Sequence, residues 1–596
     1  MGTTLAPERP VAPRGGAAPP TAEPGASEAT PTVDRRAALA GLAVVCVLAA
    51  VLRFWAFGRV DGTPFYDAAV RSMGSSWHDF FYGAIEPGGR VAIDKTPVDL
   101  WLQVASTKVL GFSSVSLRLP QAVCGVLAVP LLFDVVRRGF GDRVGLAAAL
   151  ALAVLPVAVL TSRSDTMDTV MGTLLLLAVW VVVRARPERR ARAVVLAGAI
   201  AGLAFEVKLF QAVVGLPAIA LLGLLAVPGT LRRRLGVTAL AGLAFLVVAA
   251  AWPVVATVLP GGHPVPLGSK DGSIASVLLG YNGLDRLGAP TSGNGSANLT
   301  SLLRDGSGSP LAPLVGIELA AALVVGTLAA LVTGIRGGRA LPAVVRGLAR
   351  GDVAGALPED PAALRRVLVG TALAVWFLTG LLVFSAMGQL RPRYLEAFTP
   401  ALAGVLGVGL VVLADRALGA RRRVAAVVVA VVLAAVLAAP VAESARLVRT
   451  GAGDSGTAGR LPAPVVARLS AYLRAHQGAG VRFQVASSGI TTVAPLIVRD
   501  GRPVLVLGGI GARPLVTLPA LRSAIAAGQV RFVLAGAGPA RLGTIRWVQR
   551  HGTDVSAAAG LPRRVRLYRV DGPGVAGRSG TTAAPGAARA VVPGRR

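Results

Sequence analysis

Long apolar runs alternate with short polar segments along most of the chain. Residues 235–259 are one example, because this run contains no charged side chain. A helix needs roughly 20 apolar residues to cross the ~30 Å hydrocarbon core of a bilayer. The pattern therefore predicts a polytopic α-helical membrane protein with about eleven transmembrane helices. We place these helices at about 37–57, 115–136, 144–161, 168–183, 193–207, 209–228, 235–259, 311–334, 367–387, 395–414 and 424–441.

Basic side chains lie in every second loop between the predicted helices. Arginine clusters precede the first helix and follow the second, fourth, sixth, eighth and tenth. Lys and Arg accumulate in cytoplasmic loops, so the N-terminus is predicted to be cytoplasmic and the protein to reside in the cell (plasma) membrane. An odd number of helices then places the C-terminal region outside the cytoplasm. The external loops at about 58–114 and 260–310 are long, and long loops often carry function.

The composition changes after residue 442. Short apolar runs at 481–487, 503–509 and 530–536 alternate with segments of helical pattern. This alternation predicts a small parallel α/β domain outside the membrane, at about 450–570.

The chain is therefore expected to consist of four parts. Residues 35–441 form the predicted transmembrane domain, and residues 450–570 form the extracytoplasmic α/β domain. Residues 1–34 and 571–596 are rich in Pro, Ala and Gly and lack an apolar core. Such segments are predicted to be disordered tails, the first of them cytoplasmic.

The overall composition argues against a nucleic-acid-binding protein and against a protein held together by disulfides. The chain is 54% hydrophobic, 15% charged and has a formal net charge of +31. Its basic residues lie between apolar runs without aromatic interleaving, so anionic lipid headgroups explain the charge better than nucleic acid does. The two cysteines, Cys46 and Cys124, both lie within apolar runs, and this indicates neither a disulfide nor a metal site.

Ionisable side chains gather at the predicted external side, where they are functional candidates. The first motif is Asp94-Lys95-Thr96-Pro97. The carboxylate of Asp94 could hold a metal ion or orient an acceptor, and Lys95 could bind a phosphate as a point charge. A charged helix start at the membrane interface is the structural alternative.

The second motif, TSRSDTMDTVM at 161–171, lies between the third and fourth predicted helices. It places Arg163, Asp165 and Asp168 at the external end of the bundle. Asp168 falls near the start of the fourth helix, where simple helix capping is a serious alternative. Capping does not explain Arg163 and Asp165 beside it. The start of the first external loop adds two further carboxylates, Asp61 and Asp67.

Taken in order, these motifs resemble a known family. The segments are FYDAAVRSM (65–73), DKTPVDLWLQ (94–103), SRSDTMDTVM (162–171), GYNGLDRL (280–287) and QLRPRYLEAFTPALAGVLG (389–407). They look like the bacterial GT-C glycosyltransferases related to protein O-mannosyltransferases and to the lipid A aminoarabinose transferase. The resemblance covers roughly 37–570. It is nearest to a bacterial mannosyltransferase subgroup that carries an extra C-terminal α/β domain.

The resemblance implies a GT-C-like fold and a polyprenyl-phosphate-linked sugar as donor. The sugar would be a mannose-like hexose or a pentose, and the acceptor an extracytoplasmic glycan, lipid or protein. Asp94 and Lys95 match the family's acid-Lys-Pro-Pro element, with Thr96 in place of a proline. Asp168 matches the acid of the second external loop.

Two departures from the family pattern leave roles open. An adjacent Asp-Glu pair that is frequent in the family is replaced by Gly62 and Thr63, so the catalytic base is open among Asp61, Asp67 and Asp94. The segment that often reads His-Pro-Tyr-Tyr in the family reads Arg391-Pro392-Arg393-Tyr394 here. This argues against a His-dependent metal site and suits a lipid phosphate. The need for a divalent metal ion stays open, with Asp94 as the candidate ligand.

The expected function is transfer of the sugar to an external hydroxyl. Lys95, Arg163, Arg391 and Arg393 would contact the donor phosphate, with Asp165 and Tyr394 beside them. The competing interpretation is a transporter or flippase of a lipid-linked sugar. Transporters usually place ionisable residues near the bilayer midplane and show repeated halves. The external position of the charges therefore favours the transferase.

Overall fold

The computed structural model describes residues 34–60, 62–286, 357–387, 391–419, 423–453, 461–478, 480–536 and 541–571, with residues 2, 346, 347, 350 and 355 in isolation. The predicted helix at 311–334, the two predicted tails apart from their edges, and Asp61 lie outside these residues.

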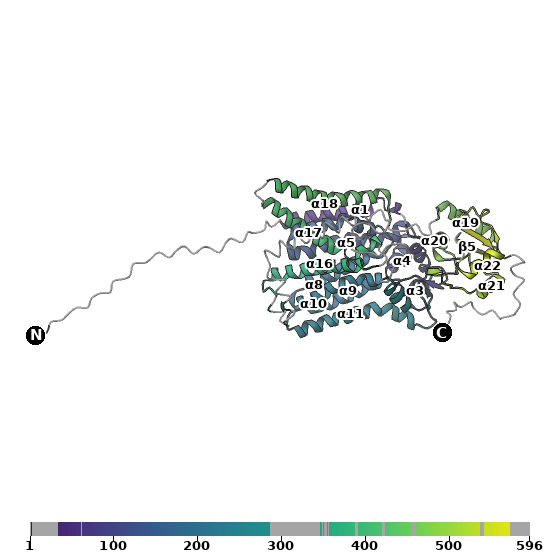
Figure 1. The fold of residues 1–596 in the computed structure, drawn as a ribbon, viewed down its shortest axis with the longest axis horizontal. Helices are drawn as coiled ribbons and strands as arrows, with labels where there is room; N and C mark the ends of the chain where they lie inside the picture. Colours follow the sequence, from purple (N-terminus) through teal and green to yellow (C-terminus); the bar gives the residue numbers. More distant parts are fainter. Residues whose placement is uncertain are drawn as a thin grey trace.

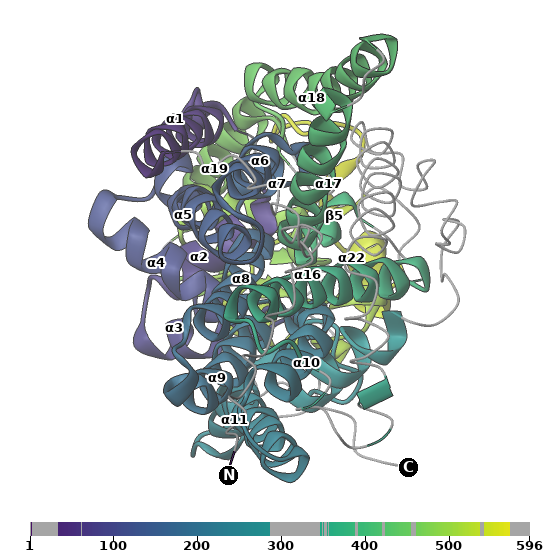
Figure 2. The same cartoon turned by 90° about the vertical axis from the view of Figure 1, so that its left-hand side faces the viewer.

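Long apolar helices run side by side and form a bundle (Figure 1). They are α1 (Arg35–Phe54), α5 (Ser114–Phe140), α6 (Asp142–Val154), α7 (Pro156–Ser162), α8 (Asp168–Arg184), α9 (Arg190–Lys208), α10 (Leu216–Ala226), α11 (Leu231–Val258), α16 (Pro361–Ser385), α17 (Thr399–Gly419) and α18 (Arg423–Thr450). Every predicted transmembrane helix that falls on described residues coincides with one or two of them. Helix α8 lies in the middle of the bundle, in contact with α5, α9, α10, α16 and α17 (Figure 2).

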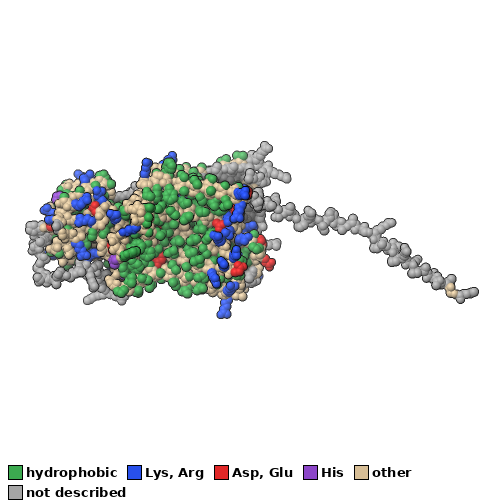
Figure 3. Space-filling view, turned by 180° about the vertical axis from the view of Figure 1, so that it is seen from behind, with side chains coloured by type: hydrophobic (Ala, Val, Ile, Leu, Met, Phe, Trp, Pro, Cys, Tyr) green, Lys and Arg blue, Asp and Glu red, His purple; other side chains and the backbone are tan. Residues whose placement is uncertain are grey.

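Several helical stretches of the described chain are long and apolar enough to cross a membrane. There are five, and the bent pair α6–α7 would make a sixth. The five are Arg35–Arg59, Ser114–Phe140, Pro187–Ala226, Leu231–Val258 and Pro361–Ser385. Figure 3 shows the belt of hydrophobic side chains that these helices expose, with Lys and Arg gathered along one border of the belt. The protein is thus a multi-pass membrane protein, whereas the number of eleven helices stays a prediction.

Two breaks in the helices shape the end of the bundle that carries the candidate site. Helices α6 and α7 are bent by 58° at Leu155, because Pro156 cannot donate a backbone hydrogen bond to continue α6. Helices α9 and α10 are joined by the 3-10 turn η3 (Leu209–Gly215) and run antiparallel, since Arg190 at the start of α9 donates to the carbonyl of Ala226 at the end of α10 (3.3 Å).

Small residues let α9 and α11 approach each other closely. A Cβ atom built on Gly198 would lie 2.1 Å from the carbonyl oxygen of Ala241, so only glycine fits there. Such contacts between small residues are a common way of packing helices in membranes.

The first long loop folds into short elements at one end of the bundle. These are α2 (Pro64–Met73), α3 (Trp77–Tyr82), β1 (Val91–Ala92) and α4 (Val98–Leu110). Strand β1 pairs in parallel with β2 (Val265–Pro266), which belongs to the second long loop. This second loop continues through the π-helical turn η4 (Ser276–Tyr281) and the 3-10 turn η5 (Leu284–Arg286). The two loops therefore form one layer.

The C-terminal region forms a small α/β domain. Its elements are α19 (Ala463–His476), β3 (Ala486–Ser487), α20 (Ile490–Asp500), β4 (Leu505–Val506), η7 (Ile510–Ala512), α21 (Leu518–Ala526), β5 (Phe532–Gly536), α22 (Gly543–His551), β6 (Thr553–Asp554) and β7 (Val565–Arg569). The strand order is β4-β3-β5-β7-β6. Strands β3, β4 and β5 are parallel, whereas β7 is antiparallel to both β5 and β6. The prediction of a wholly parallel sheet is therefore wrong, because the chain after β6 returns as a hairpin.

The C-terminal domain packs directly on the layer that the two long loops form. Helix α20 lies against α2, and one continuous hydrophobic core includes Val70 and Ile93 from the loops as well as Val493 and Ile497 from α20. Arg513 also donates a hydrogen bond to the carbonyl of Ser269. Figure 1 shows the domain at one end of the bundle, beyond α3 and α4.

Candidate functional site

Asp94 and Lys95 lie in the turn between β1 and α4, at the end of the bundle that carries the C-terminal domain. The ammonium of Lys95 is 2.8 Å from both carboxylate oxygens of Asp94. The two side chains are 11% and 8% exposed, so the pair is shielded but can be reached. The turn is tied down on both sides, because Thr96 donates to the carbonyl of Glu206 on α9 and Asn282 donates to the carbonyl of Asp94.

Asp168 forms a second ion pair, with a residue that the sequence did not single out as functional. The ammonium of Lys208, the last residue of α9, is 2.7 Å from Asp168 Oδ2. Both side chains are buried, at 3% and 0% exposure. Asp168 is the first residue of α8, and its neighbour Met167 occupies the N-cap position without a side-chain hydrogen bond. The carboxylate is therefore engaged by a cation and does not cap the helix.

The backbone conformation of Leu209 ends α9 directly after Lys208. Its φ is 55°, which is uncommon for a residue with a bulky side chain. Such a conformation costs about 1–3 kcal/mol and persists only where the surroundings enforce it. Leu209 is buried, so the packed core supplies that constraint.

Tyr66 on α2 links the two ion pairs. The ammonium of Lys95 lies 5.6 Å from the centre of its ring. Burial and, after it, the Asp94 carboxylate raise the pKa of the Tyr66 phenol, on which Asp168, Lys208 and Arg393 also act electrostatically. The Asp94–Lys95 pair thus lies beside Tyr66.

Asp165 and Arg163 have well-defined partners. The carboxylate of Asp165 accepts hydrogen bonds from the backbone N–H and hydroxyl of Thr63, at 2.6 and 2.9 Å. The guanidinium of Arg163 is fully buried and donates to the carbonyls of three residues at the end of α1, Leu52, Arg53 and Trp55. These contacts favour a structural role for Arg163 over contact with a donor phosphate.

Asp67 lies in the first turn of α2. Its Oδ2 atom and Arg118 Nη2 of α5 both lie 2.4 Å from the place that a Cβ atom on Gly62 would occupy. The carboxylate therefore faces Arg118 at Gly62, where a larger residue would not fit.

Residues 391–394 lead into a turn that contacts α7, α8 and η3. The 3-10 turn η6 (Pro392–Ala397) begins just after Arg391, which is exposed. The guanidinium of Arg393 lies 5.7 Å from the ring of Tyr394 and also acts electrostatically on the phenol of Tyr66. Tyr394 is buried beside Phe384.

A buried polar network supports the site from α4, and the sequence did not reveal it. Asp99 accepts hydrogen bonds from the side-chain amides of Gln103 (2.8 Å) and Gln121 (2.8 Å). Burial raises the pKa of Asp99 to about 7, although these bonds and the nearby Lys208 oppose the shift. Gln103 also donates to the carbonyl of Asp165 (3.0 Å), which joins this network to the second motif. The spacing of Asp99 and Gln103, four residues apart on one face of α4, is the sequence signal that could have indicated this network.

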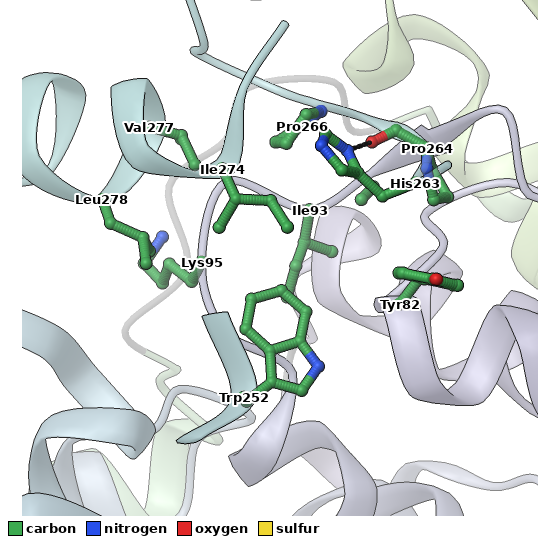
Figure 4. A pocket seen from close by; sticks show the side chains of 11 residues that line it. Tyr82, Ile93, Lys95, Trp252, His263, Pro264, Pro266, Ile274, Val277 and Leu278 are labelled. Atoms are coloured by element: carbon green, nitrogen blue, oxygen red, sulfur yellow. Dashed lines mark hydrogen bonds between the residues drawn. The ribbon is translucent and has the colours of Figure 1, made fainter. Parts of the chain in front are cut away.

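A small pocket opens beside Lys95. Aromatic and aliphatic side chains form most of its wall, including Tyr82 and Ile93 of the first loop and Trp252 of α11 (Figure 4). His263 and Leu278 from the second loop complete it. The pocket thus lies where both long loops meet the bundle.

The described residues contain no group of three or more His, Cys, Asp and Glu side chains that could hold a metal ion. Asp94 directs both of its oxygens at Lys95. The two described carboxylates of the site, Asp94 and Asp168, are each paired with a lysine, which is a poor fit to a divalent cation.

Two families match parts of this chain. Residues 94–255 match "Dolichyl-phosphate-mannose-protein mannosyltransferase", and residues 469–551 match "Putative mannosyltransferase YkcB-like, C-terminal". The first match begins at Asp94 and includes both ion pairs. Two Bacillus subtilis proteins named as mannosyltransferases, YycA and YkcB, are 34% and 32% identical over 43% of this chain. The chain spans just over a third of the length of these curated relatives, at 37% and 36%.

Solved structures share the fold across most of the chain. ArnT from Cupriavidus metallidurans, bound to undecaprenyl phosphate, superimposes with a TM-score of 0.53 at 16% identity, over 92% of this chain and 100% of ArnT. The chain therefore shares the fold of ArnT, and residues 469–551 resemble the C-terminal domain of YkcB-like proteins. The oligosaccharyltransferase AglB from Archaeoglobus fulgidus gives a TM-score of 0.50 at 13% identity, over 84% of this chain and 69% of AglB. The predicted fold class is confirmed.

Proposed function

We propose that this GT-C-type protein is a glycosyltransferase. It transfers a sugar, a mannose-like hexose or a pentose, from a polyprenyl-phosphate donor to an acceptor outside the cytoplasm. The observation that carries the proposal is the reachable Asp94–Lys95 pair beside the buried Asp168–Lys208 pair, at one end of the bundle. The family match over 94–255 and the undecaprenyl phosphate bound to ArnT support this choice of donor.

Lys95 is the proposed contact for the donor phosphate. Its ammonium is held by Asp94 alone among the described carboxylates, and a phosphate that bound there would compete with Asp94 for it. Arg393 supplies a second positive charge near Tyr66. Neutralising the phosphate makes the polyprenyl phosphate a better leaving group, because negative charge develops on it as the bond to the sugar breaks.

Asp94 is the proposed general base. Once the donor phosphate draws Lys95 away, the Asp94 carboxylate is free to accept the proton of the acceptor hydroxyl. The acceptor oxygen then bonds to the anomeric carbon, and the polyprenyl phosphate leaves with the electron pair of the broken bond. A positioned base contributes typically about 10²–10⁴-fold to such a reaction. The position of both pairs at one end of the bundle favours a transferase over a transporter.

The test of this proposal is a turnover assay. The full chain, reconstituted in lipid nanodiscs, is incubated with a panel of radiolabelled polyprenyl-phosphate sugars and an envelope extract, with Asp94→Asn as the inactive control. We expect transfer from one donor to a component of the extract, and none with Asp94→Asn. Mass spectrometry of envelope glycans from a deletion strain should show the same sugar missing. Equal turnover of wild type and Asp94→Asn would refute the assignment of the base.

We also propose that the C-terminal domain lies outside the cytoplasm and the N-terminus inside. The arginine-rich border of the hydrophobic belt lies at the end opposite the C-terminal domain (Figure 3), and this supports the orientation. Alkaline phosphatase fused after residue 453 should be active, because this enzyme folds only outside the cytoplasm. A fluorescent protein fused at residue 2 should be bright. An inactive phosphatase fusion would reverse the proposed topology.

Arg513→Ala should weaken donor binding although Arg513 lies in the C-terminal domain. The guanidinium holds the carbonyl of Ser269 just after β2, and β2 pairs with the strand that leads to Asp94. A hydrogen bond from a charged group contributes about 1.5–3 kcal/mol, so we expect the KM for the donor to rise roughly tenfold. Arg502→Ala is the matched control, because Arg502 donates to Gln477 within its own domain. An equal effect of both variants would argue against coupling through β2.

Glu86→Gln should remove a loss of stability at alkaline pH. Burial raises the pKa of Glu86 from its ordinary value of 4.5 to about 8, although the N–H groups of Arg90 and Val91 donate to it. The folded state therefore binds this proton more tightly than the unfolded state does. The contribution to stability is complete below pH 4.5 and is lost as the pH rises through about 8.

Thermal unfolding in detergent at pH 6 and pH 9 measures this effect. The melting temperature of the wild type should fall more between the two values than that of Glu86→Gln. Glu359→Gln, at an exposed position, is the control and should behave as the wild type does. Parallel curves for the wild type and Glu86→Gln would contradict the assignment.

A further inference from the structure

The C-terminal domain carries an unusual excess of positive charge. Between residues 461 and 571 the sequence contains fifteen arginines, no lysine, three aspartates and no glutamate. From residue 501 to residue 553 there are seven arginines and no acidic residue at all. The tendency of Lys and Arg to gather in cytoplasmic loops does not explain this excess, because the domain lies at the end opposite the arginine-rich border of the bundle (Figure 3).

Few of these arginines are neutralised within the domain. Ion pairs between the described residues of the domain engage four of them, Arg499, Arg531, Arg566 and Arg569, with Asp500, Asp554 or Asp571. Of those that remain, Arg541, Arg546 and Arg550 are all exposed and lie at the start of α22 or on it. We name these three side chains the α22 arginine surface.

The geometry of α22 presents this surface to solvent. Ile545 and Val548 pack into the core of the domain, whereas Arg546 and Arg550 are one helical turn apart on the opposite side. Arg550 donates to the carbonyl of Arg546 (3.3 Å), which keeps its guanidinium along the helix. Arg522 of the neighbouring α21 lies 5.9 Å from the ring of Trp547 and extends the positive region.

The position of the surface decides which kind of anion can reach it. Helices α21 and α22 lie on the side of the domain away from the transmembrane helices, and α20 lies on the near side (Figure 1). Lipid headgroups of the membrane in which the protein is embedded are therefore out of reach. A row of guanidinium groups suits repeated phosphate or carboxylate groups, because each guanidinium can donate two parallel hydrogen bonds to such a group.

We propose that the α22 arginine surface binds an anionic envelope glycan, a polymer that bears phosphate or carboxylate groups. This inference rests on the proposed function in one respect, namely that the bound polymer is the sugar acceptor or carries it. Binding raises the local concentration of acceptor ends near the Asp94–Lys95 site without a new catalytic group. Positive fields of this kind also speed the capture of a charged partner.

Binding measured without any donor tests the proposal independently of turnover. The full chain is held in nanodiscs of zwitterionic phosphatidylcholine, and three probes are titrated in: phosphorylated dextran, polygalacturonate and unmodified dextran. The wild type should bind the two charged polymers and not the neutral one, and the affinity should fall as salt is added. The triple variant Arg541→Gln, Arg546→Gln, Arg550→Gln should bind them about tenfold or more weakly.

The matched control removes the same charge elsewhere in the domain. Arg468→Gln, Arg474→Gln and Arg482→Gln together alter three other exposed arginines, and this variant should bind almost as the wild type does. The double variant Arg546→Gln, Arg550→Gln serves if the triple variant unfolds. Equal weakening in the α22 variant and the control would overturn the proposal, since binding would then follow total charge. Tighter binding of phosphatidylglycerol vesicles than of either polymer would overturn it as well.

If polymer binding fails while donor turnover persists, the glycosyltransferase proposal stands and the α22 surface loses its role. If polymer binding succeeds in a protein that turns over none of the donors, the surface stands without the acceptor assignment. The two results are therefore distinguishable.

Discussion

Lys95→Ala should lower kcat/KM for the polyprenyl-phosphate donor by roughly 10²–10³-fold, which is the usual loss when one group that stabilises developing charge is removed. Both the KM for the donor and kcat should suffer, because the ammonium is expected to contact the phosphate before and during the departure of the polyprenyl phosphate. Asp94, which now pairs with Lys95 at 2.8 Å, would also lose the cation that orients it. Initial rates over a range of donor concentrations separate the two effects.

Lys270→Ala is the matched control for this variant. Lys270 lies in the second long loop and pairs with Asp285 at 2.9 Å, but its side chain is 71% exposed. Exposed ion pairs contribute about 0–1 kcal/mol, so the variant should retain its activity and stability. Wild-type kinetics in Lys95→Ala would remove this residue from the site and leave the proposed mechanism without a phosphate contact.

The transmembrane helices could be predicted from the sequence because a lipid-spanning helix has a strong local signal. Each predicted helix on the described residues needed only its own apolar run, as at α1 and α11. The turn after Lys208 coincides with the boundary between two predicted helices, whereas the bend at Pro156 falls inside the single helix predicted at 144–161. The hairpin of β6 and β7 was missed because β6 is two exposed residues long and has no apolar run.

The partners of the site residues could not be predicted, since they depend on which helices lie side by side. Lys208 appeared only as a charge at a turn, and its pairing with Asp168 requires α8 and α9 to be neighbours. In the sequence, a structural arginine such as Arg163 cannot be told from an arginine that contacts a phosphate. Its hydrogen bonds to the end of α1 join residues about 110 positions apart, and no local pattern indicates them. Lys95 differs because its partner is its neighbour in the sequence.

Asp168→Asn should lower both stability and activity, and a second substitution should separate these effects. Asn has the shape of Asp but no charge, so the ammonium of Lys208 would remain buried without its counter-ion. Breaking a buried ion pair in this way costs about 3–5 kcal/mol. We therefore expect a large fall in the melting temperature of the purified protein, together with loss of most of the turnover.

Asp168→Asn combined with Lys208→Met removes both charges and the cost of the unpaired cation. Replacing a buried pair by uncharged side chains of similar volume is often neutral, so most of the lost stability should return. Activity should nevertheless stay low. The charges of Asp168 and Lys208 both act electrostatically on Tyr66, and the ring of Tyr66 lies against Lys95. Melting temperature and single-turnover rate, measured on the same three proteins, complete the comparison. Recovery of activity together with stability would mean that the Asp168–Lys208 pair only holds α8 against α9, and the site would then consist of Asp94, Lys95 and their immediate neighbours.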